Sequence, residues 1–340
     1  MIRVSILGAT GYSGGELLKY LLNDPDLTIS HITSESSSGM SVALAHPWLR
    51  GRLNLQFEAL NVKKIAADSD VVFSCYPAGV GMKPIAYFIK AGLKVIDLSA
   101  DYRLSSASLY KNWYKITHTE TKLLSKAVYG LPELFRSQIS HASLVANPGC
   151  YATAAALAAA PLLEAGIVHP DGLIVDAKSG VSGAGKKVAF TYLYNEVDEN
   201  LTAYNVASHR HQPEIEQTLS RVRKGPVRLT FTPHLIPMKR GILSVLYATL
   251  KKPMKTSKLV SLFEGRYHGE PFIRVLPEGE LPQTKNVTNT NYCDIGIAQD
   301  ARMSRVIVFS ALDNLVKGAA GQAIQNMNLL LNREETRGLL

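Results

Sequence analysis

The sequence contains few of the residues and segments that define several large classes of protein. Its 340 residues include only three cysteines, Cys75, Cys150 and Cys293, which are widely spaced and form no Cys-x-x-Cys pair. Neither a disulfide framework nor a zinc site is therefore indicated, and we expect no metal. The chain has no run of about 18 apolar residues, and the apolar stretch after Met1 is too short for a signal peptide. We therefore expect a cytoplasmic protein without membrane contact.

Low-complexity tracts and internal repeats are also missing, and the composition is that of an ordinary globular protein. Hydrophobic residues make up 46% and charged residues 19% of a chain that is long enough for two domains. The formal net charge is +9, from 37 basic and 28 acidic residues. The basic residues are mostly scattered, and no nucleic-acid recognition motif accompanies them. This charge favours small anionic molecules or an acidic partner protein over nucleic acid.

The first residues have the pattern of a nucleotide-binding turn. A β-like run from Ile2 to Leu7 leads into glycines at positions 8, 11 and 14, and an amphipathic helical pattern follows from Glu16 to Leu22. Glycines at this spacing permit a tight turn, the approach of a pyrophosphate to the helix N-terminus, and close packing of helix on strand. A glycine loop that binds nothing is the alternative. The candidate cofactor contacts are Gly8, Thr10, Gly11, Tyr12, Ser13 and Gly14.

More β-like runs follow, with helical stretches between them. This alternation predicts that residues 1–147 form a Rossmann-type doubly wound parallel sheet, the dinucleotide-binding domain. The runs are Thr28–Thr33, Val71–Cys75 and Val95–Leu98.

The end of the second β-like run bears on the choice between NAD and NADP. An acidic residue there takes the ribose 2′-hydroxyl of NAD, whereas hydroxyl groups and cations accept the 2′-phosphate of NADP. Glu35 lies at about this position, but serines stand on both sides of it, at 34 and at 36 to 38. These hydroxyls favour NADP(H), with Ser34, Ser36 and Ser37 as candidate contacts.

The second half of the chain has a different pattern, in which strand-forming runs are separated by polar loops. It predicts an α+β catalytic and dimerisation domain over residues 148–313, with a largely antiparallel sheet. Tyr247 and Lys251 match the Tyr-x-x-x-Lys spacing of short-chain dehydrogenases, but they fall in an alternating β-like run and not on a helical face. The predicted strands are Leu173–Ala177, Val227–Phe231, Ile242–Leu250 and Arg305–Leu312.

A small-residue loop from Ser179 to Lys187 nearly matches a P-loop. Gly180, Gly185 and Lys186 have the right spacing, but Lys187 stands where a Ser or Thr would hold magnesium. A second nucleotide site is therefore disfavoured. We expect instead that this loop shields phosphate or nicotinamide with its backbone N–H groups.

Cys150 ends the tetrapeptide Asn-Pro-Gly-Cys and opens the alanine-rich run Tyr151–Ala160, which predicts a helix. The N-terminus of a helix carries unpaired N–H groups and a partial positive charge, and both favour a thiolate over a thiol. Cys150 is therefore a candidate nucleophile. The alternative is a small buried residue, since free cysteines often behave as small hydrophobes.

A second dense cluster of polar residues is His209-Arg210-His211-Gln212-Pro213-Glu214. A thiolate nucleophile needs a base that takes its proton and later returns one, and imidazole suits that role near neutral pH. Metal binding through both histidines is disfavoured because no third ligand lies nearby in the sequence. A surface loop without function is the other alternative. Arg103, in Ser-Ala-Asp-Tyr-Arg-Leu after a predicted parallel strand, is placed to hold an anion or to form a surface salt bridge.

These features together resemble the arginine-pathway branch of the semialdehyde dehydrogenase family, along essentially the full chain. Two departures stand out: Tyr76-Pro77-Ala78-Gly79 replaces the usual Leu-Pro-His-Gly, and Ala152 replaces a usual proline. The first departure puts cofactor contacts at Pro77 in question. The segments that carry the resemblance are Gly8–Gly15, Asn147–Tyr151, His209–Glu214 and Asp313–Gln322.

The resemblance implies a function and roles for individual residues. The expected reaction is NADPH-dependent reduction of N-acetyl-L-glutamyl 5-phosphate to the 5-semialdehyde through a thioacyl intermediate on Cys150. His209 would be the general base, with His211 as a close competitor. Asn314 and Gly183 would lie near the nicotinamide, and a terminal helix within residues 314–333 would return to the nucleotide domain.

The substrate contacts and the oligomeric state are less closely defined. Arg103 and the loop from Ser182 to Lys187 are candidates for the phosphate, and Arg210 and Glu214 for the acylated amino-acid end; Asn147 and His211 complete the candidate substrate contacts. A homodimer or homotetramer is expected. Alternatives are a reductase of carrier-protein-bound aminoadipyl or glutamyl phosphate, other thioacyl semialdehyde or aldehyde-phosphate dehydrogenases, and a non-catalytic NADP-sensing regulator.

Overall fold

The chain folds into two compact units. The computed structural model describes residues 1–186 and 188–340. Unit 1 comprises residues 1–148 and 319–340, and unit 2 comprises residues 149–318. The domain boundaries expected from the sequence, after residues 147 and 313, lie close to these two points. The chain therefore leaves unit 1 immediately before Cys150 and returns to it near the end.

Unit 1 is built on a six-stranded, fully parallel sheet in the order β2-β1-β3-β4-β6-β5. The order reverses at β1, which pairs with both β2 and β3, and nucleotide folds bind their ligand at the carboxyl end of such a switch point. All four residues of β3 are buried, as expected for a central strand covered on both faces. The predicted Rossmann-type sheet is confirmed. The strands are β1 (Ile2–Leu7), β2 (Leu27–Ile32), β3 (Val71–Ser74), β4 (Lys94–Asp97), β5 (Val128–Tyr129) and β6 (Leu144–Ala146).

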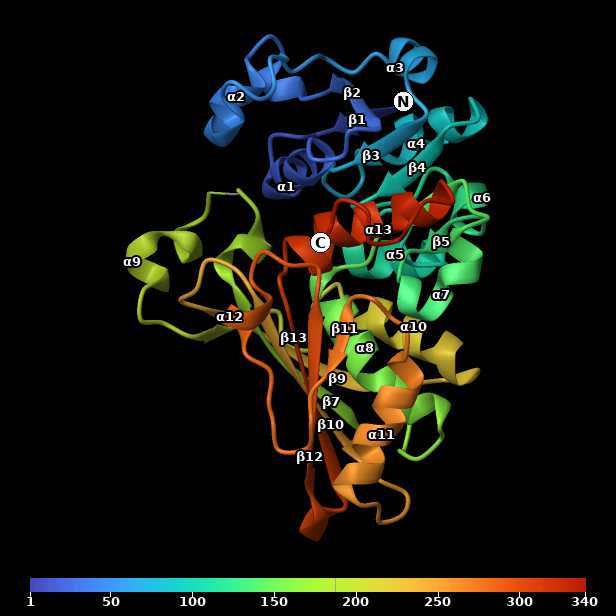
Figure 1. The fold of residues 1–340 in the computed structure, drawn as a ribbon, viewed down its shortest axis with the longest axis vertical. Helices are drawn as coiled ribbons and strands as arrows, with labels where there is room; N and C mark the ends of the chain where they lie inside the picture. Colours follow the sequence, from blue (N-terminus) through green and yellow to red (C-terminus); the bar gives the residue numbers. More distant parts are fainter. Residues whose placement is uncertain (187) are drawn as a thin grey trace. The chain divides into compact units, whose positions relative to one another are not determined.

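Eight α-helices of the described residues belong to unit 1, and the last of them comes from the end of the chain. Figure 1 shows α13, in red, beside the blue-to-green elements of this unit. Buried amides attach it there: Gln322 Nε2 and Asn326 Nδ2 both donate to the carbonyl of Gly130, at 2.7 and 2.8 Å. The helices are α1 (Tyr12–Leu21), α2 (Val42–Ala45), α3 (Val62–Asp68), α4 (Met82–Lys90), α5 (Ala107–Tyr114), α6 (Thr121–Leu124), α7 (Pro132–Ile139) and α13 (Gly321–Leu330).

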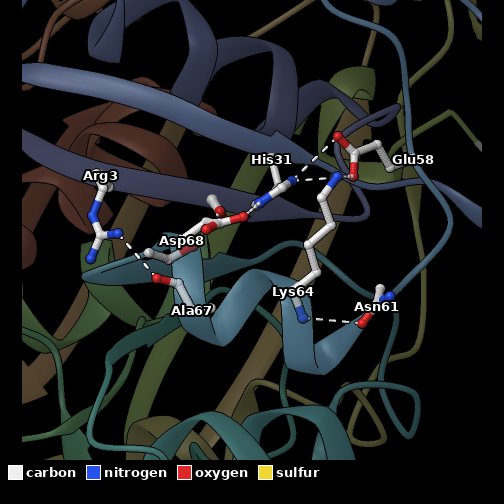
Figure 2. A network of polar contacts seen from close by, with 9 residues as sticks. Arg3, His31, Glu58, Asn61, Lys64, Ala67 and Asp68 are labelled. Atoms are coloured by element: carbon white, nitrogen blue, oxygen red, sulfur yellow. Dashed lines mark hydrogen bonds and ion pairs between the residues drawn. The ribbon is translucent and has the colours of Figure 1, made fainter.

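A polar network joins β2 to α3 (Figure 2). His31 is 5% exposed, and its two ring nitrogens lie 3.1 Å from Glu58 Oε2 and 3.2 Å from Asp68 Oδ2. Lys64 Nζ donates to the same Glu58 oxygen at 3.1 Å. The network was not predicted, because its carboxylates come from segments distant from His31 in the sequence.

Unit 2 is built on a seven-stranded mixed sheet in the order β11-β12-β13-β10-β7-β9-β8. Four of its six pairings are antiparallel, so the predicted largely antiparallel sheet is confirmed. Tyr247 lies within β10 and Lys251 beyond its end, so they do not form a helical pair. The strands are β7 (Leu173–Gly180), β8 (Thr202–Ala203), β9 (Leu229–Ile236), β10 (Ile242–Thr249), β11 (Ile273–Val275), β12 (Cys293–Asp300) and β13 (Arg305–Leu312).

The predicted strands correspond to β7, β9, β10 and β13, and the other three strands, β8, β11 and β12, were not predicted. The longest of these three is β12, with eight residues. Gly296 and the acidic residues at its two ends weaken its β pattern. The glycine is required by packing, since a Cβ at this position would lie 2.8 Å from Pro282 Cδ. The helices of unit 2 are α8 (Cys150–Glu164), α9 (Tyr194–Val197), α10 (Gln212–Arg223), α11 (Thr256–Tyr267) and α12 (Thr284–Val287).

Helix α8 forms the centre of unit 2 and is buried along nearly its whole length. Its alanines permit close approach to the sheet, where Ser310 Oγ donates to the carbonyl of Ala154 at 2.9 Å. Pro161 lacks an N–H, which leaves the carbonyl of Leu157 without its usual helical donor. The hydroxyl of Tyr267 donates to that carbonyl at 2.6 Å instead. The buried helix therefore keeps this acceptor satisfied despite its proline.

None of the helices in the described part of the chain has the length and apolarity that crossing a bilayer requires.

Candidate active site

Cys150 is the first residue of α8, in agreement with the predicted helix start. Gly149 is the N-cap, in an extended conformation, and its N–H donates to Glu214 Oε1 at 2.8 Å. The carbonyl of Gly149 accepts the N–H of Thr153 at 2.9 Å, which closes the first turn. Cys150 is partly exposed, so its sulfur is placed at the positive end of a helix and remains accessible.

The imidazole of His211 packs directly on the residue before Cys150. A Cβ added to Gly149 would lie 2.4 Å from Nε2 and 2.6 Å from Cε1 of His211, closer than any real side chain allows. Gly149 is therefore required by the close approach of this ring. His211 occupies the N-cap position of α10, so the start of one helix presents its imidazole to the start of the other.

His209 lies in an aromatic enclosure beside His211. Its ring centroid is 5.7 Å from Tyr151, 5.5 Å from Tyr204 and 5.2 Å from Phe231. Its Nδ1 accepts the backbone N–H of His211 at 3.1 Å. Burial lowers the pKa of His209 to about 3, with His211 and Arg210 acting in the same direction and Glu214 opposing them. The ring is therefore neutral near pH 7 and carries its proton on Nε2.

Two tyrosines complete this enclosure, and neither was predicted to have a role. The Tyr204 hydroxyl donates to the Tyr151 hydroxyl at 3.2 Å, which in turn donates to the carbonyl of His234 at 3.1 Å. Burial raises the pKa of both phenols, so both remain protonated. No sequence signal marked Tyr204, because the segment around it has no motif.

Glu214 belongs to the first turn of α10 and is fully buried. It was expected at the acylated amino-acid end of the substrate, but in the structure it bonds the N–H of Gly149. Arg210, expected at the same end, is exposed, and its charge contributes to the depressed pKa of His209.

Asn314 is 2% exposed and both atoms of its amide make hydrogen bonds within unit 2. Its Oδ1 accepts the N–H of Gly241 at 2.7 Å, and its Nδ2 donates to Ser182 Oγ at 2.9 Å. Asn314 therefore connects the start of β10 to the loop that follows β7. Gly183 belongs to the same loop, and a Cβ there would lie 3.0 Å from Ser179 Oγ.

The backbone of the loop from Gly180 to Gly185 is already largely hydrogen bonded. The N–H groups of Gly180, Val181 and Ser182 donate to the carbonyls of Gly241, Met238 and Lys239, at 2.9, 2.9 and 3.0 Å. These three groups are therefore not available to the phosphate or nicotinamide that the loop was expected to shield. Partial burial lowers the pKa of Lys186, and Lys187 lies outside the described residues.

In unit 1, the three glycines of the first turn have the geometry that nucleotide binding requires. Gly8 has a φ of +68°, and a Cβ at Gly14 would lie 2.5 Å from Ala9 Cα. A Cβ at Gly11, the N-cap of α1, would meet no atom of the described residues within 4 Å. The first and third glycines therefore serve the turn and the packing, and the second leaves the helix N-terminus open. Thr10, Tyr12 and Ser13 adjoin this N-terminus.

After β2, the carboxylate of Glu35 is engaged by its own chain. Its Oε1 accepts the N–H of Leu60 at 2.9 Å. Ser34 is buried, whereas Ser36 is exposed and Ser37 is half-buried. The loop after β3, which contains Pro77, is held by Asp101 Oδ1, which accepts the N–H of Gly79 at 2.7 Å.

Arg103 bonds two backbone carbonyls of unit 1. Its Nε donates to the carbonyl of Asn147 at 2.8 Å and its Nη2 to that of Leu98 at 2.7 Å. It therefore supports the segment that leads to Cys150, a role that was not predicted. Asn147 Nδ2 donates to the carbonyl of Ala319 at 3.0 Å.

Within residues 1–186 and 188–340, no three His, Cys, Asp or Glu side chains come together in a way that could hold a metal ion.

Comparisons with known proteins agree with this architecture. The family model described as "Semialdehyde dehydrogenase, NAD binding domain" matches residues 3–142, and "Semialdehyde dehydrogenase, dimerisation domain" matches residues 150–314. Aspartate semialdehyde dehydrogenase II from Vibrio cholerae has the same fold, with a TM-score of 0.73, 18% identity, and coverage of 98% of this chain and 99% of that one. The enzyme of Candida albicans, solved with NADP, has a TM-score of 0.72 and 17% identity over 97% and 98%. Fold and site together define a semialdehyde dehydrogenase, a class of enzymes that use a nicotinamide cofactor.

Sequence similarity narrows this class. The N-acetyl-gamma-glutamyl-phosphate reductase of Symbiobacterium thermophilum is 54% identical over 100% of this chain and 97% of its own length. The reductases of a Geobacter species and of Moorella thermoacetica are 51% and 47% identical, over 100% of this chain and 98% of theirs. The chain belongs to the N-acetyl-gamma-glutamyl-phosphate reductase family.

Proposed function

We propose that this chain reduces N-acetyl-γ-glutamyl phosphate to the semialdehyde with NADPH and releases phosphate, as a step of arginine biosynthesis. The observation that carries the proposal is that relatives 47–54% identical along the whole chain are named for this substrate. The position of Cys150 at the N-terminus of α8, beside His211, supports it chemically. Family membership favours an enzyme over a non-catalytic NADP sensor.

In this mechanism the Cys150 thiolate attacks the carbonyl carbon of the acyl phosphate. A carbon–sulfur bond forms, the carbon–oxygen bond to phosphate breaks, and the thioester remains on the enzyme. NADPH, when bound, supplies the hydride that reduces this thioester. The resulting hemithioacetal then loses its carbon–sulfur bond, which releases the semialdehyde and restores the thiolate. Two easier steps replace one difficult step, and the N-terminal N–H groups of α8 stabilise the thiolate at both ends of the cycle.

We assign His211 as the general base in preference to His209, which the sequence favoured. Nδ1 of His209 already accepts the His211 N–H, so the neutral ring has no acceptor nitrogen left for a proton. The low pKa of His209 also makes it a poor proton carrier near neutral pH. His211 instead lies against Gly149, next to the nucleophile.

Glu214 fits a positioning role better than substrate binding. Its buried carboxylate bonds the N–H of Gly149, and it is close enough to His209 to affect that residue's pKa. It therefore orients the segment that carries Cys150.

The cofactor preference that we propose is NADP(H). The open N-terminus of α1 at Gly11 would take the pyrophosphate. The carboxylate of Glu35 already accepts the N–H of Leu60. We therefore do not assign it to the ribose 2′-hydroxyl. The serine hydroxyls beside it, Ser36 and Ser37, are left as hydrogen-bond partners for a 2′-phosphate.

The remaining substrate contacts are proposed from the charges of the side chains and of the substrate. Arg210, exposed next to the imidazoles, suits the carboxylate of the substrate, and Lys186 suits the phosphate. The acetylated small molecule is favoured over a carrier-bound acyl phosphate by the names of the relatives. A homodimer or homotetramer and a cytoplasmic location stay predictions, the first supported by the match to a dimerisation domain.

The test is phosphate-dependent reduction of NADP with N-acetylglutamate semialdehyde, run with Cys150→Ser and with Cys293→Ala as the matched cysteine control. Replacement of the nucleophile is expected to lower kcat by about 1000-fold or more, while NADPH binding is retained. The control is expected to keep its activity. Turnover of Cys150→Ser at the parent rate would overturn the thioacyl mechanism. A parent enzyme that turns over only carrier-bound substrate would overturn the substrate assignment.

A further inference from the structure

A second glycine, Gly318, packs directly against Cys150. A Cβ at Gly318 would lie 2.7 Å from the Cβ and 3.2 Å from the Cα of Cys150, and 3.3 Å from the carbonyl oxygen of Asp313. Carbon atoms do not approach this closely without displacement of one partner. The neighbours on that side are rigid main chain and the first carbon of the cysteine side chain. Only glycine therefore fits at position 318 without displacing Cys150 or the main chain.

Gly318 reaches this position because the chain makes a π-helical turn at Val316–Ala320. The N–H of Gly318 donates to the carbonyl of Asp313 at 2.9 Å, a bond that spans five residues. The family resemblance implied a terminal helix within residues 314–333, but the regular helix begins only at Gly321. π-turns are rare and are frequently found at functional sites, so the contacts that stabilise this one matter to the site.

Asp313 provides these contacts. Its side chain is fully buried, and its Oδ1 accepts the N–H of Leu315 at 2.9 Å and that of Val316 at 3.3 Å, the first N–H groups of the turn. Its Oδ2 accepts the N–H of Asn289 at 2.7 Å and pairs with Arg240 Nε at 2.8 Å. A buried carboxylate is stable when it is paired and fully hydrogen bonded, and Asp313 meets both conditions.

We propose that Gly318, held by Asp313 in the π-turn, is the positioning residue that fixes Cys150 for attack. Gly149 leaves room for the His211 ring next to the residue that precedes Cys150 in the chain, and Gly318 leaves room for the Cα and Cβ of Cys150. This inference rests on the proposed role of Cys150 as nucleophile.

The test compares Gly318→Ala with Gly265→Ala, in which a new Cβ in the last turn of helix α11 meets no atom of the described residues within 4 Å. The added methyl of Gly318→Ala must displace Cys150 by roughly 1 Å, and a misplacement of that size lowers kcat by about 100-fold. We also expect slower alkylation of Cys150 by iodoacetamide and an altered pH profile of that reaction, with unchanged NADPH binding. Gly265→Ala should match the parent in each measurement.

A second variant keeps the inference testable if Gly318→Ala does not fold. Asp313→Asn preserves shape but weakens the bonds to Asn289 and Arg240, so it should lower kcat and alkylation rate in the same direction and to a smaller extent. Parent-like turnover and alkylation in either folded variant would overturn the inference. That result is distinct from failure of the thioacyl mechanism, which Cys150→Ser reports independently.

Discussion

The Nδ1 atom of His209 accepts the backbone N–H of His211 at 3.1 Å. This bond fixes the tautomer of the His209 ring and the backbone position of His211. His209 is held as a neutral donor inside an aromatic enclosure, and His211 is held against Gly149 at the start of α8. This hydrogen bond therefore gives the two histidines different roles. His209 supports the backbone of His211, and His211 is the candidate base.

The two histidines should therefore respond differently to replacement. His211→Asn is expected to lower kcat by about 100-fold to 10,000-fold, the usual contribution of general acid–base catalysis. His209→Asn retains a polar side chain that can accept the His211 N–H, so its loss should be about ten times smaller. Steady-state kinetics over pH 5 to 9 measure both. A larger loss in His209→Asn than in His211→Asn would reverse the assignment.

Glu214 offers a prediction about stability. In Glu214→Gln, the amide oxygen can still accept the Gly149 N–H, whereas Glu214→Ala leaves this buried donor without its partner. The alanine variant should lose about 1–3 kcal/mol of the free energy of unfolding, and the glutamine variant less than 1 kcal/mol. Urea unfolding followed by circular dichroism and by amide hydrogen exchange in α8 and α10 makes the comparison, because both tryptophans, Trp48 and Trp113, lie in unit 1. Equal losses in the two variants would show that the Gly149 bond is not the source.

Two buried groups, one in each unit, should contribute to acid stability with opposite signs. In unit 2, burial lowers the pKa of His209 from 6.5 to about 3, so only the unfolded chain binds a proton as the pH falls below 6.5, and stability is lost down to about pH 3. In unit 1, burial raises the pKa of Asp97 from 3.8 to about 6, so the folded chain binds the proton first and stability is gained from pH 6 to 3.8.

Each group contributes a slope of up to about 1.4 kcal/mol per pH unit within its window. Amide hydrogen exchange followed separately for β4 and for β9 reports each unit between pH 6 and pH 4. Relative to the parent, Asp97→Asn should lose the acid gain in β4, and His209→Asn should lose the acid sensitivity in β9. Parallel shifts of both strands in both variants would contradict this account.

Cofactor preference should depend on the serines after β2 and not on Glu35. Ser37→Glu places a carboxylate where the 2′-phosphate is expected, so the KM for NADPH should rise by at least about tenfold, while that for NADH changes little. Glu35→Ala should instead affect stability, since Glu35 bonds the N–H of Leu60. Kinetics with both cofactors measure the ratio. A rise in the KM for NADH alone would indicate that NAD is the natural cofactor.

Much of the fold could be predicted because local pattern determines it. The strand, glycine turn and helix at Ile2–Leu21 follow from alternating apolar residues and three glycines, and the observed geometry at Gly8 and Gly14 matches that pattern. The helix that begins at Cys150 could be predicted from Pro148 and Gly149 before it and from the alanines that follow in the sequence. Strand β12 was not predicted, since the glycine that its packing needs also weakens its local pattern.

The residues of the candidate site were proposed from the sequence, but their arrangement was not. Cys150, His209, His211 and Glu214 were all named from the sequence, yet their division of labour depends on which atoms meet. Tyr204 and the role of Gly318 had no local signal, because each acts through a residue far away in the sequence.

The sequence by itself determined the nucleotide turn, the two fold classes and the presence of a cysteine at a helix start. These features depend on backbone preferences and on periodicity within one segment. Only the tertiary structure decided that His211 lies on Gly149, that Gly318 lies on Cys150 and that Glu35 turns to Leu60. Such contacts depend on close packing between distant segments, which leaves no periodic trace in either one.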